Sequence, residues 1–192
     1  KLDTSKWILK EFEEIQKRYF DNIEKYQFHE IASSLYHFTW HTYCDWYIEF
    51  IKSDFKDPEK SEETIKVSGW VFVQILKLLH PVMPFITEKL WLSLVDKKTF
   101  LMNQEFIKIN FDHSYQESKK YILKIIEIMT ALRNLRADLN ISYKNEIDLI
   151  IDAKNDYLKK FISNYEEEFK RLIKTNTISY EENSNQKKSA FI

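Results

Sequence analysis

Glycine, proline and cysteine are scarce in this chain, and these scarcities exclude several classes of protein. The sequence has 192 residues but only 1 Gly, 3 Pro and 1 Cys. All-β sandwiches and barrels need glycine and proline at many turns, and Rossmann or P-loop phosphate cradles need glycines in series. A chain with a single glycine cannot build such a cradle. A mainly helical protein is what remains.

The chain also lacks a disulfide, a membrane span and a strong net charge. Cys44 is alone, which excludes an internal disulfide and a multi-cysteine zinc site. No apolar run approaches the roughly 18 residues of a spanning helix, and no secretory signal is evident. The 29 Lys and Arg against 30 Asp and Glu leave a net charge of −1, so any nucleic-acid binding must come from a local patch or from shape. We expect a cytoplasmic protein, and the start at Lys1 rather than Met indicates a piece of a longer chain.

Apolar residues recur at the three-and-four spacing of amphipathic helices along most of the chain. Asp3 or Thr4 is a fair N-cap for the first helix. Proline disfavours helical geometry in the residue before it, so His80-Pro81 should end the third helix, and Pro84 should lie near the start of the fourth. Residues 96–116 have no sustained period and should form an extended connection. The expected helices cover residues 3–25, 28–50, 61–79, 85–95 and 117–139, a bundle of about five helices.

The pattern changes after Asn140 and predicts a small α+β appendage. Residues 146–151 alternate as a strand does, and a helical pattern covers residues 155–173. Short strands are expected at 177–180 and 189–192, with a mobile loop at 181–188 between them. The fold class is therefore mainly α, with a helical bundle at residues 1–141 and the appendage at residues 142–192.

No catalytic motif stands out in the sequence. His37, His41 and Asp45 share one face of the second expected helix and could converge on a metal, but a zinc protease would have Glu directly after its first His. A polar stripe on an exposed helix is the favoured interpretation. Cys44 lies among aromatic residues and is expected to be a small buried thiol. We predict no catalytic residue and no metal site in this chain.

The second expected helix offers a strip that a partner could bind. His41, Asp45, Ile48 and Lys52 lie roughly opposite the apolar face that contains Tyr43. Aromatic side chains can stack on unpaired RNA bases, although most of those on this helix should be core. The aromatic residues in question are Phe38, Trp40, Tyr43, Trp46 and Tyr47.

Two arginines near the end of the last long helix form a second candidate. Arg133 and Arg136 are three residues apart, so both guanidinium groups lie on one helical face. They could clamp a phosphate or form salt bridges on the surface, where they would also complement the helix dipole.

Four sequence blocks carry a family resemblance. They are YQFHEIA at 26–32, LYHFTWHTYCDWYIE at 35–49, LHPVMPFITEKLW at 79–91 and LRNLRA at 132–137. In this order they resemble the anticodon-binding domain of valyl-tRNA synthetases over about residues 1–141. The run CDWY at 44–47 favours the valyl enzymes over their isoleucyl relatives.

The resemblance implies a domain that binds the anticodon stem-loop of tRNA(Val) and contacts upstream catalytic and editing domains of the same chain. Aminoacylation with ATP and Mg would belong to those upstream domains, because the two signature motifs of class I synthetases do not occur here. Asp45 would accept a hydrogen bond from the exocyclic amine of a cytosine, and Ile48 would pack beside the base. His41 and Lys52 would flank them. Arg133 and Arg136 would either contact the tRNA backbone or form pairs that hold the last long helix against the bundle.

One departure and two rival functions accompany this interpretation. Many bacterial valyl enzymes continue into a coiled-coil arm that touches tRNA, whereas this chain reaches Ile192 without heptads. The first rival is a helical module that binds another protein or another domain, without salt-dependent RNA binding. The second is a metal-dependent enzyme built on His37, His41 and Asp45.

Overall fold

The computed structural model describes residues 2–151, 159 and 162–180. The chain divides into two compact units, residues 1–122 and 123–192, with the boundary inside the last long helix. Each unit is described by itself. The predicted mainly helical fold with a small sheet near the C-terminus is confirmed. The predicted domain boundary at residue 141 stays a prediction, because a division into compact units does not define the limits of a domain.

Unit 1 begins with α1 (Asp3–Glu24), whose apolar stripe forms the centre of the bundle. Trp7, Phe12 and Tyr19 are almost completely buried on this helix. The helix begins at Asp3 without a side-chain cap, since the N-cap position is occupied by Leu2. The prediction of an Asp3 or Thr4 cap was therefore wrong, and Thr4 is buried instead.

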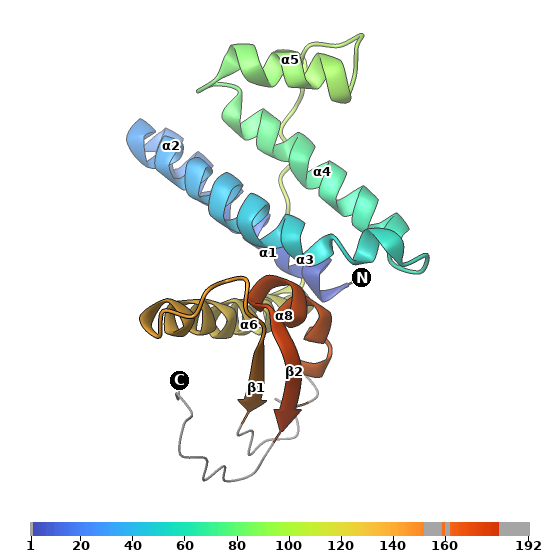
Figure 1. The fold of residues 1–192 in the computed structure, drawn as a ribbon. Coiled ribbons are helices and arrows are strands. Elements are labelled where there is room, and N and C mark those ends of the chain that lie inside the picture. Colours follow the sequence, from blue (N-terminus) through green and yellow to red (C-terminus); the bar gives the residue numbers. More distant parts are fainter. Residues whose placement is uncertain (1, 152–158, 160–161, 181–192) are drawn as a thin grey trace. The chain divides into compact units, whose positions relative to one another are not determined.

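The second helix is continuous but changes its winding. It consists of α2 (Phe28–His37), a π-helical stretch (Phe38–Tyr47) and α3 (Ile48–Ile51), which we together call helix two. Figure 1 shows these stretches as one rod. π-Helical turns are rare and frequently occur at functional sites. The predicted helix at 28–50 is confirmed, whereas its π-helical part was not foreseen.

Aromatic packing joins helix two to α1. The Trp7 ring meets the Tyr47 and Phe50 rings edge-on, with centroids 6.2 and 6.0 Å apart. Such edge-to-face pairs contribute about 0.5–1.5 kcal/mol beyond the area they bury. One face of helix two is thereby fixed in the core, and the opposite face is left exposed.

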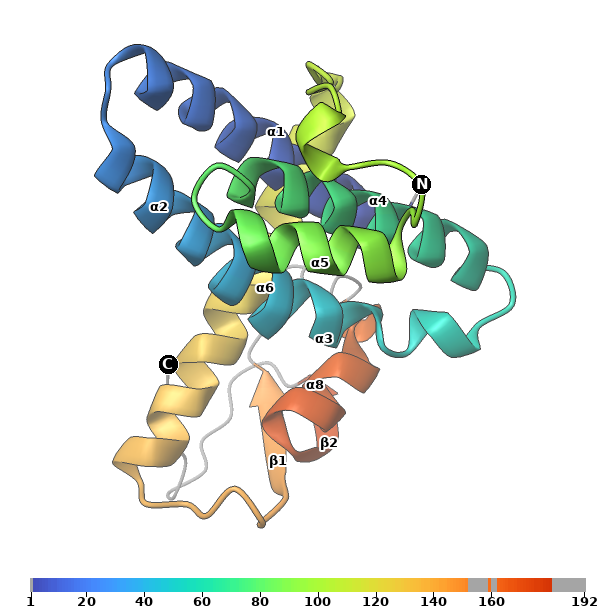
Figure 2. The same ribbon diagram turned by 90° about the horizontal axis from the view of Figure 1, so that it is seen from above.

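Two further helices complete unit 1 before the last long one. A short 3-10 turn (Asp54–Lys56) leads to α4 (Ser61–Leu79), which packs on α1, and α5 (Pro84–Leu94) then folds back beside α4 (Figure 2). His80 ends α4 as predicted, and its Nδ1 lies 2.8 Å from the hydroxyl of Thr87 on α5. The predicted extended connection contains one 3-10 turn (Leu101–Asn103). The helix α6 (His113–Asp138) begins four residues earlier than predicted.

Unit 2 contains the rest of α6 and a two-stranded parallel sheet. β1 (Ile147–Ile151) pairs with β2 (Thr175–Tyr180), and α8 (Glu166–Ile173) precedes β2 (Figure 1). The register shifts between Ile147 and Leu149. The predicted strands at 146–151 and 177–180 are confirmed. The helix predicted at 155–173 is confirmed only in part, because a turn at residues 164–165 separates the helical residues 162–163 from α8. The loop predicted at 181–188 and the strand predicted at 189–192 lie outside the described residues.

Left-handed residues end helices in this glycine-poor chain. Tyr26, Asn140 and Lys174 have φ values of 57°, 54° and 59°. After α1 the amide of Gln27 donates to the carbonyl of Asn22 at 2.9 Å, which is the hydrogen bond of a Schellman motif. Residues other than glycine therefore adopt the conformation that glycine usually supplies at such ends.

Candidate nucleic-acid interface

The exposed face of helix two carries most of the predicted binding residues. Tyr36, His37, Trp40, His41, Cys44, Asp45 and Lys52 are exposed, and Ile48 is half-buried. Tyr43, Tyr47 and Phe50 are buried on the other side. The predicted opposition of the two faces is confirmed. We call the exposed face the helix-two strip, defined by Tyr36, His37, Trp40, His41, Asp45, Ile48 and Lys52.

A histidine and a carboxylate are held together in the middle of the strip. The Nδ1 atom of His41 lies 3.1 Å from Oδ2 of Asp45, and both side chains are nearly half exposed. The ring of His37 lies beside that of His41, with 5.1 Å between their centroids. This arrangement presents a carboxylate acceptor and imidazole groups on a surface that a base edge can approach.

Lys52 is the cation of the helix-two strip, and its ammonium group already has an acidic partner. Lys52 forms an ion pair with Glu49 one turn earlier on the same helix, and the lysine side chain is 52% exposed. Exposed ion pairs of this kind are worth at most about 1 kcal/mol. The ammonium group can therefore exchange Glu49 for a phosphate at small cost.

Two large aromatic side chains are exposed at one end of the strip. Trp40 is 54% exposed and Tyr36 is 62% exposed, and the Tyr36 ring meets the His41 ring edge-on at 6.0 Å. Trp40 was named from the sequence as a possible stacking residue, whereas Tyr36 was not. The signal was available, because Tyr36 lies four residues before Trp40 and next to Leu35, which is buried.

The remaining aromatic residues of helix two belong mainly to the core. The Tyr43 hydroxyl donates to the carbonyl of Ser68 at 3.1 Å, and burial raises the pKa of Tyr43 to about 12. Phe38 and Tyr47 are buried as well. The prediction that most of these aromatics are core is confirmed.

The prediction that Cys44 is a buried thiol was wrong, because its side chain is exposed. It lies between Tyr43, which faces the core, and Asp45, which faces outward. Partial burial and then the charge of Asp45 raise the pKa of the thiol. The thiolate is therefore disfavoured, and Cys44 has no sign of an activated nucleophile.

The two arginines have different environments in unit 2. Arg136 is buried, and its guanidinium donates to the carbonyls of Ile173, Ser142 and Asn145 at 3.1, 2.8 and 2.7 Å. The ring of Tyr143 lies 5.6 Å from its central carbon. These contacts join α6 to segments of unit 2 and not to the helices of the bundle, so the predicted pairing of Arg136 against the bundle is not what the structure shows. Arg133 is half-buried and makes a contact of its own.

Neither a metal site nor a membrane span is found in the part of the chain that the structure describes. No group of three or more His, Cys, Asp or Glu side chains in residues 2–151, 159 and 162–180 is placed to hold a metal ion. His37, His41 and Asp45 form a row along the helix rather than such a group. Within the same residues, every helix is too short or too polar to cross a bilayer.

Known proteins are similar to this chain in sequence. Residues 5–151 match the family model described as the anticodon-binding domain of tRNA ligase. A valine–tRNA ligase of Pelagibacter ubique is 36% identical over 176 residues, which is 89% of this chain and 20% of that protein. A valine–tRNA ligase of Staphylococcus aureus strain JH9 is 32% identical over 160 residues, which is 82% of this chain and 18% of that protein.

The chain thus spans about a fifth of the length of these curated relatives. The resemblance indicated by the four sequence blocks is confirmed. The family match extends beyond the last block into β1, so it includes residues of both compact units. With a family model that covers most of its length, this chain belongs to the family of anticodon-binding domains of tRNA ligases.

Proposed function

We propose that this chain binds the anticodon stem-loop of tRNA(Val) as one domain of a valine–tRNA ligase. The observation that carries the proposal is the helix-two strip, where a carboxylate, two imidazoles, an ammonium group and two exposed aromatic rings lie along one helical face. Protein recognition of RNA loops commonly combines stacking on aromatic rings with hydrogen bonds to base edges. The strip offers both kinds of group.

The relatives support the wider part of the proposal. The two ligases described above are named for valine, and this chain aligns with about a fifth of each. In the proposed ligase, aminoacylation with ATP and Mg takes place in domains outside this chain, in the cytoplasm. The catalytic part of the reaction is not assigned to any residue here.

Asp45 is proposed as the reader of a base edge. A carboxylate accepts a hydrogen bond from the exocyclic amine of cytosine, and His41 holds that carboxylate in place at 3.1 Å. Ile48 is half-buried beside it and offers an apolar contact to the base. Lys52 would pair with a phosphate of the loop after it releases Glu49.

Arg133 is the proposed contact of unit 2 with the tRNA backbone. A guanidinium group suits phosphate oxygens, and a backbone contact contributes affinity without sequence preference. Arg136 is proposed to act only indirectly, by binding two carbonyls that follow α6 and the carbonyl of the last residue of α8. Arg133 is thus proposed to bind the tRNA, and Arg136 is proposed to stabilise unit 2.

A direct binding experiment tests the proposal. The chain is titrated with a fluorescent valine-acceptor anticodon stem-loop and with the same stem-loop carrying an altered anticodon, each at two salt concentrations. Tighter binding of the valine-acceptor loop that weakens as salt increases is the expected result. Equal binding of both loops, or binding to neither, would overturn anticodon recognition by this chain.

Exposed apolar side chains favour interaction with a protein as the second candidate. Phe85 is 91% exposed, Met102 is 71% exposed and Leu94 is 66% exposed, all on or beside α5. Phe85 and Met102 line the same hollow beside α5, and exposed apolar side chains that lie together often mark an interface. A module of this type would bind its partner with little dependence on salt, which distinguishes it from RNA binding in the same assay.

A further inference from the structure

A cavity of about 570 Å³ opens between α1 and α4, and none of the helix-two strip lines it. Its volume falls in the range of roughly 300–1,000 Å³ that is usual for sites that bind small ligands. Leu9, Val67, Trp70 and Phe111 line it with apolar side chains, and Glu59, Glu62, Glu63 and Lys66 line it with charged ones. We call it the α1–α4 cavity.

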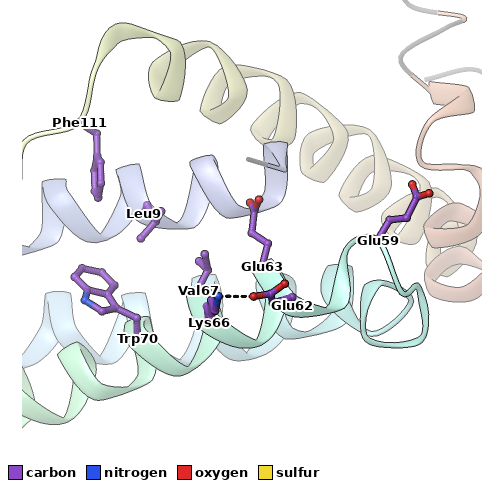
Figure 3. A pocket seen from close by; sticks show the side chains of 8 residues that line it. All are labelled: Leu9, Glu59, Glu62, Glu63, Lys66, Val67, Trp70 and Phe111. Carbon is purple, nitrogen blue, oxygen red and sulfur yellow. Dashed lines mark hydrogen bonds and ion pairs between the residues drawn. The ribbon is translucent and has the colours of Figure 1, made fainter.

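The apolar residues are gathered at one end of the α1–α4 cavity. Figure 3 shows Leu9, Trp70 and Phe111 together at this end. The Trp70 ring is held edge-on against Phe12 with centroids 5.5 Å apart, and Phe111 is stacked on Tyr115 at 4.7 Å. These contacts fix both rings, so this end of the cavity is already formed before any ligand enters.

The opposite end of the cavity is acidic. It carries three carboxylates and one ammonium group, and Lys66 donates to Glu62 at 2.5 Å (Figure 3). Glu63 accepts a hydrogen bond from the backbone amide of Leu2 at 2.7 Å, which holds this carboxylate at the rim. The neighbouring Lys60 pairs with Asp54 and Asp57 rather than with the rim. Among the residues that line the cavity, three carboxylates thus accompany one ammonium group.

The helix α4 sets the distance between the two ends. Glu63, Val67 and Trp70 follow one another at four and then three residues along one face, and seven residues of α-helix rise about 10 Å. In an extended peptide, side chains two residues apart point to the same side and are roughly 7 Å apart. A cationic and an apolar side chain in that relation reach from one end of the cavity to the other.

We propose that the α1–α4 cavity binds an extended peptide segment of a protein partner that carries an arginine or lysine two residues from a large apolar side chain. The apolar side chain packs on Trp70 and Phe111, and the cation lies among Glu59, Glu62 and Glu63. The same carboxylates repel phosphate groups, so nucleic acid is disfavoured at this cavity. This site is separate from tRNA binding and does not depend on it.

The test is an NMR titration of the isotope-labelled chain with the peptide acetyl-Leu-Ser-Arg-Ser-Leu-amide, whose arginine has a leucine two residues away in either direction. We expect the indole N–H signal of Trp70 to shift in a saturable way. A peptide with the neutral isostere citrulline in place of arginine should bind about tenfold more weakly, and one with serine in place of both leucines should fail to shift the Trp70 signal.

Matched Glu→Gln variants test whether the carboxylates of the α1–α4 cavity bind the arginine of the peptide. Glu63→Gln keeps an oxygen that can accept from Leu2 but removes the charge, and it should weaken the arginine peptide about fivefold, as should Glu59→Gln. Glu127→Gln removes an exposed carboxylate that pairs with Lys124 elsewhere, and it should leave the affinity unchanged. The proposal is overturned if the Trp70 signal does not shift at millimolar peptide, if citrulline binds as well as arginine, or if the two cavity variants bind as tightly as Glu127→Gln.

Discussion

Arg136 is the residue on which we expect unit 2 to depend most. Its buried guanidinium donates to three carbonyls, and a hydrogen bond from a charged donor contributes about 1.5–3 kcal/mol. Arg136→Ala leaves these carbonyls without their donor and should cost about 3 kcal/mol of stability. Arg136→Lys should restore only part of it, because one ammonium group cannot match the guanidinium fork. Amide hydrogen exchange of β1 and β2 measures the effect.

Unit 2 contains no tryptophan, so its stability has to be followed by hydrogen exchange. All 5 tryptophans lie in residues 1–122, so their fluorescence does not report on this unit. Arg133→Ala is the matched control, since that side chain is only half-buried, and its cost should be about 1 kcal/mol or less. If the strand amides exchanged equally fast in both variants, the hydrogen bonds of Arg136 would not be the main support of unit 2.

Asp45 and Arg133 should affect tRNA binding in different ways. Asp45→Ala removes a base-edge acceptor, so it should reduce the preference for the valine anticodon by about 1–3 kcal/mol. Arg133→Ala removes a phosphate contact, so it should weaken all stem-loops by a similar factor. Affinities for matched and altered stem-loops measure both effects. Loss of preference to the same extent in the two variants would contradict this division.

The junction between α1 and α2 is strained by a left-handed tyrosine. Tyr26 has a φ of 57° and is 81% exposed, so its side chain contributes little packing beyond an edge contact with Phe28. The left-handed conformation costs an L-residue roughly 1–2 kcal/mol, whereas glycine adopts it freely. Tyr26→Gly should therefore stabilise unit 1 by about 0.5–1 kcal/mol, as measured by urea denaturation followed by tryptophan fluorescence.

Tyr26→Ala separates the backbone effect from the loss of the ring. Alanine lacks the aromatic contact, as glycine does, but retains the Cβ atom that makes the left-handed conformation unfavourable. It should be no more stable than the original chain. Equal stability of the glycine and alanine variants would show that this junction stores no backbone strain.

The strand pair should lose a stabilising contact in acid. Side-chain hydrogen bonds from Thr177 and then from Asn176 lower the pKa of Asp148, which joins β1 to β2. The folded state binds the proton less readily than the unfolded state, so the contribution is fully present above about pH 3.9 and is lost as the pH falls through the lower folded value. The protection factors of the β2 amides, which compare their exchange rates with those of the unfolded chain at the same pH, should fall below about pH 4.

Asp148→Asn tests the assignment of this acid effect. Asparagine has no charge to lose, so the fall in protection below about pH 4 should disappear, with lower protection already at neutral pH. Asp112→Asn is the control, because the pKa of Asp112 is likewise lowered, but by Ser114 in the other unit. An unchanged acid response in Asp148→Asn would assign the effect to another group.

At the scale of the whole molecule, most of the fold could be predicted because local signals and packing agree. The scarcity of glycine, the helical periodicity and His80-Pro81 gave the order and approximate ends of the helices. The π-helical stretch at residues 38–47 could not be predicted, because its sequence contains no proline, glycine or other residue that signals a change of winding. The left-handed helix ends were missed for a related reason, since Tyr26 and Lys174 are not residues that usually favour that conformation.

The candidate site was predictable in part. Helical spacing alone placed His41, Asp45 and Lys52 on an exposed face. Spacing could not separate Arg133 from Arg136, because the burial of Arg136 depends on carbonyls that lie up to 37 residues away in the sequence. The prediction for Cys44 was also wrong, because its aromatic neighbours in the sequence indicated a buried thiol and the side chain is exposed.

The charge balance of the whole chain sets the expected strength of RNA binding. A net charge of −1 provides no long-range attraction, so affinity must come from a few cations that reach phosphates, for which Lys52 and Arg133 are the proposed residues. Single-stranded contacts give a slope of about −0.7 per phosphate in a plot of log affinity against log salt. Two or three contacts should therefore give a slope of about −1.5 to −2, which is a loss of roughly tenfold between 50 and 200 mM salt. Lys52→Ala should make the slope shallower by about 0.7, whereas Lys124→Ala, which removes an exposed lysine that pairs with Glu127, should not change it. A slope near zero would mean that phosphates are not contacted. A slope steeper than about −4 would require clearly more than two or three phosphate contacts.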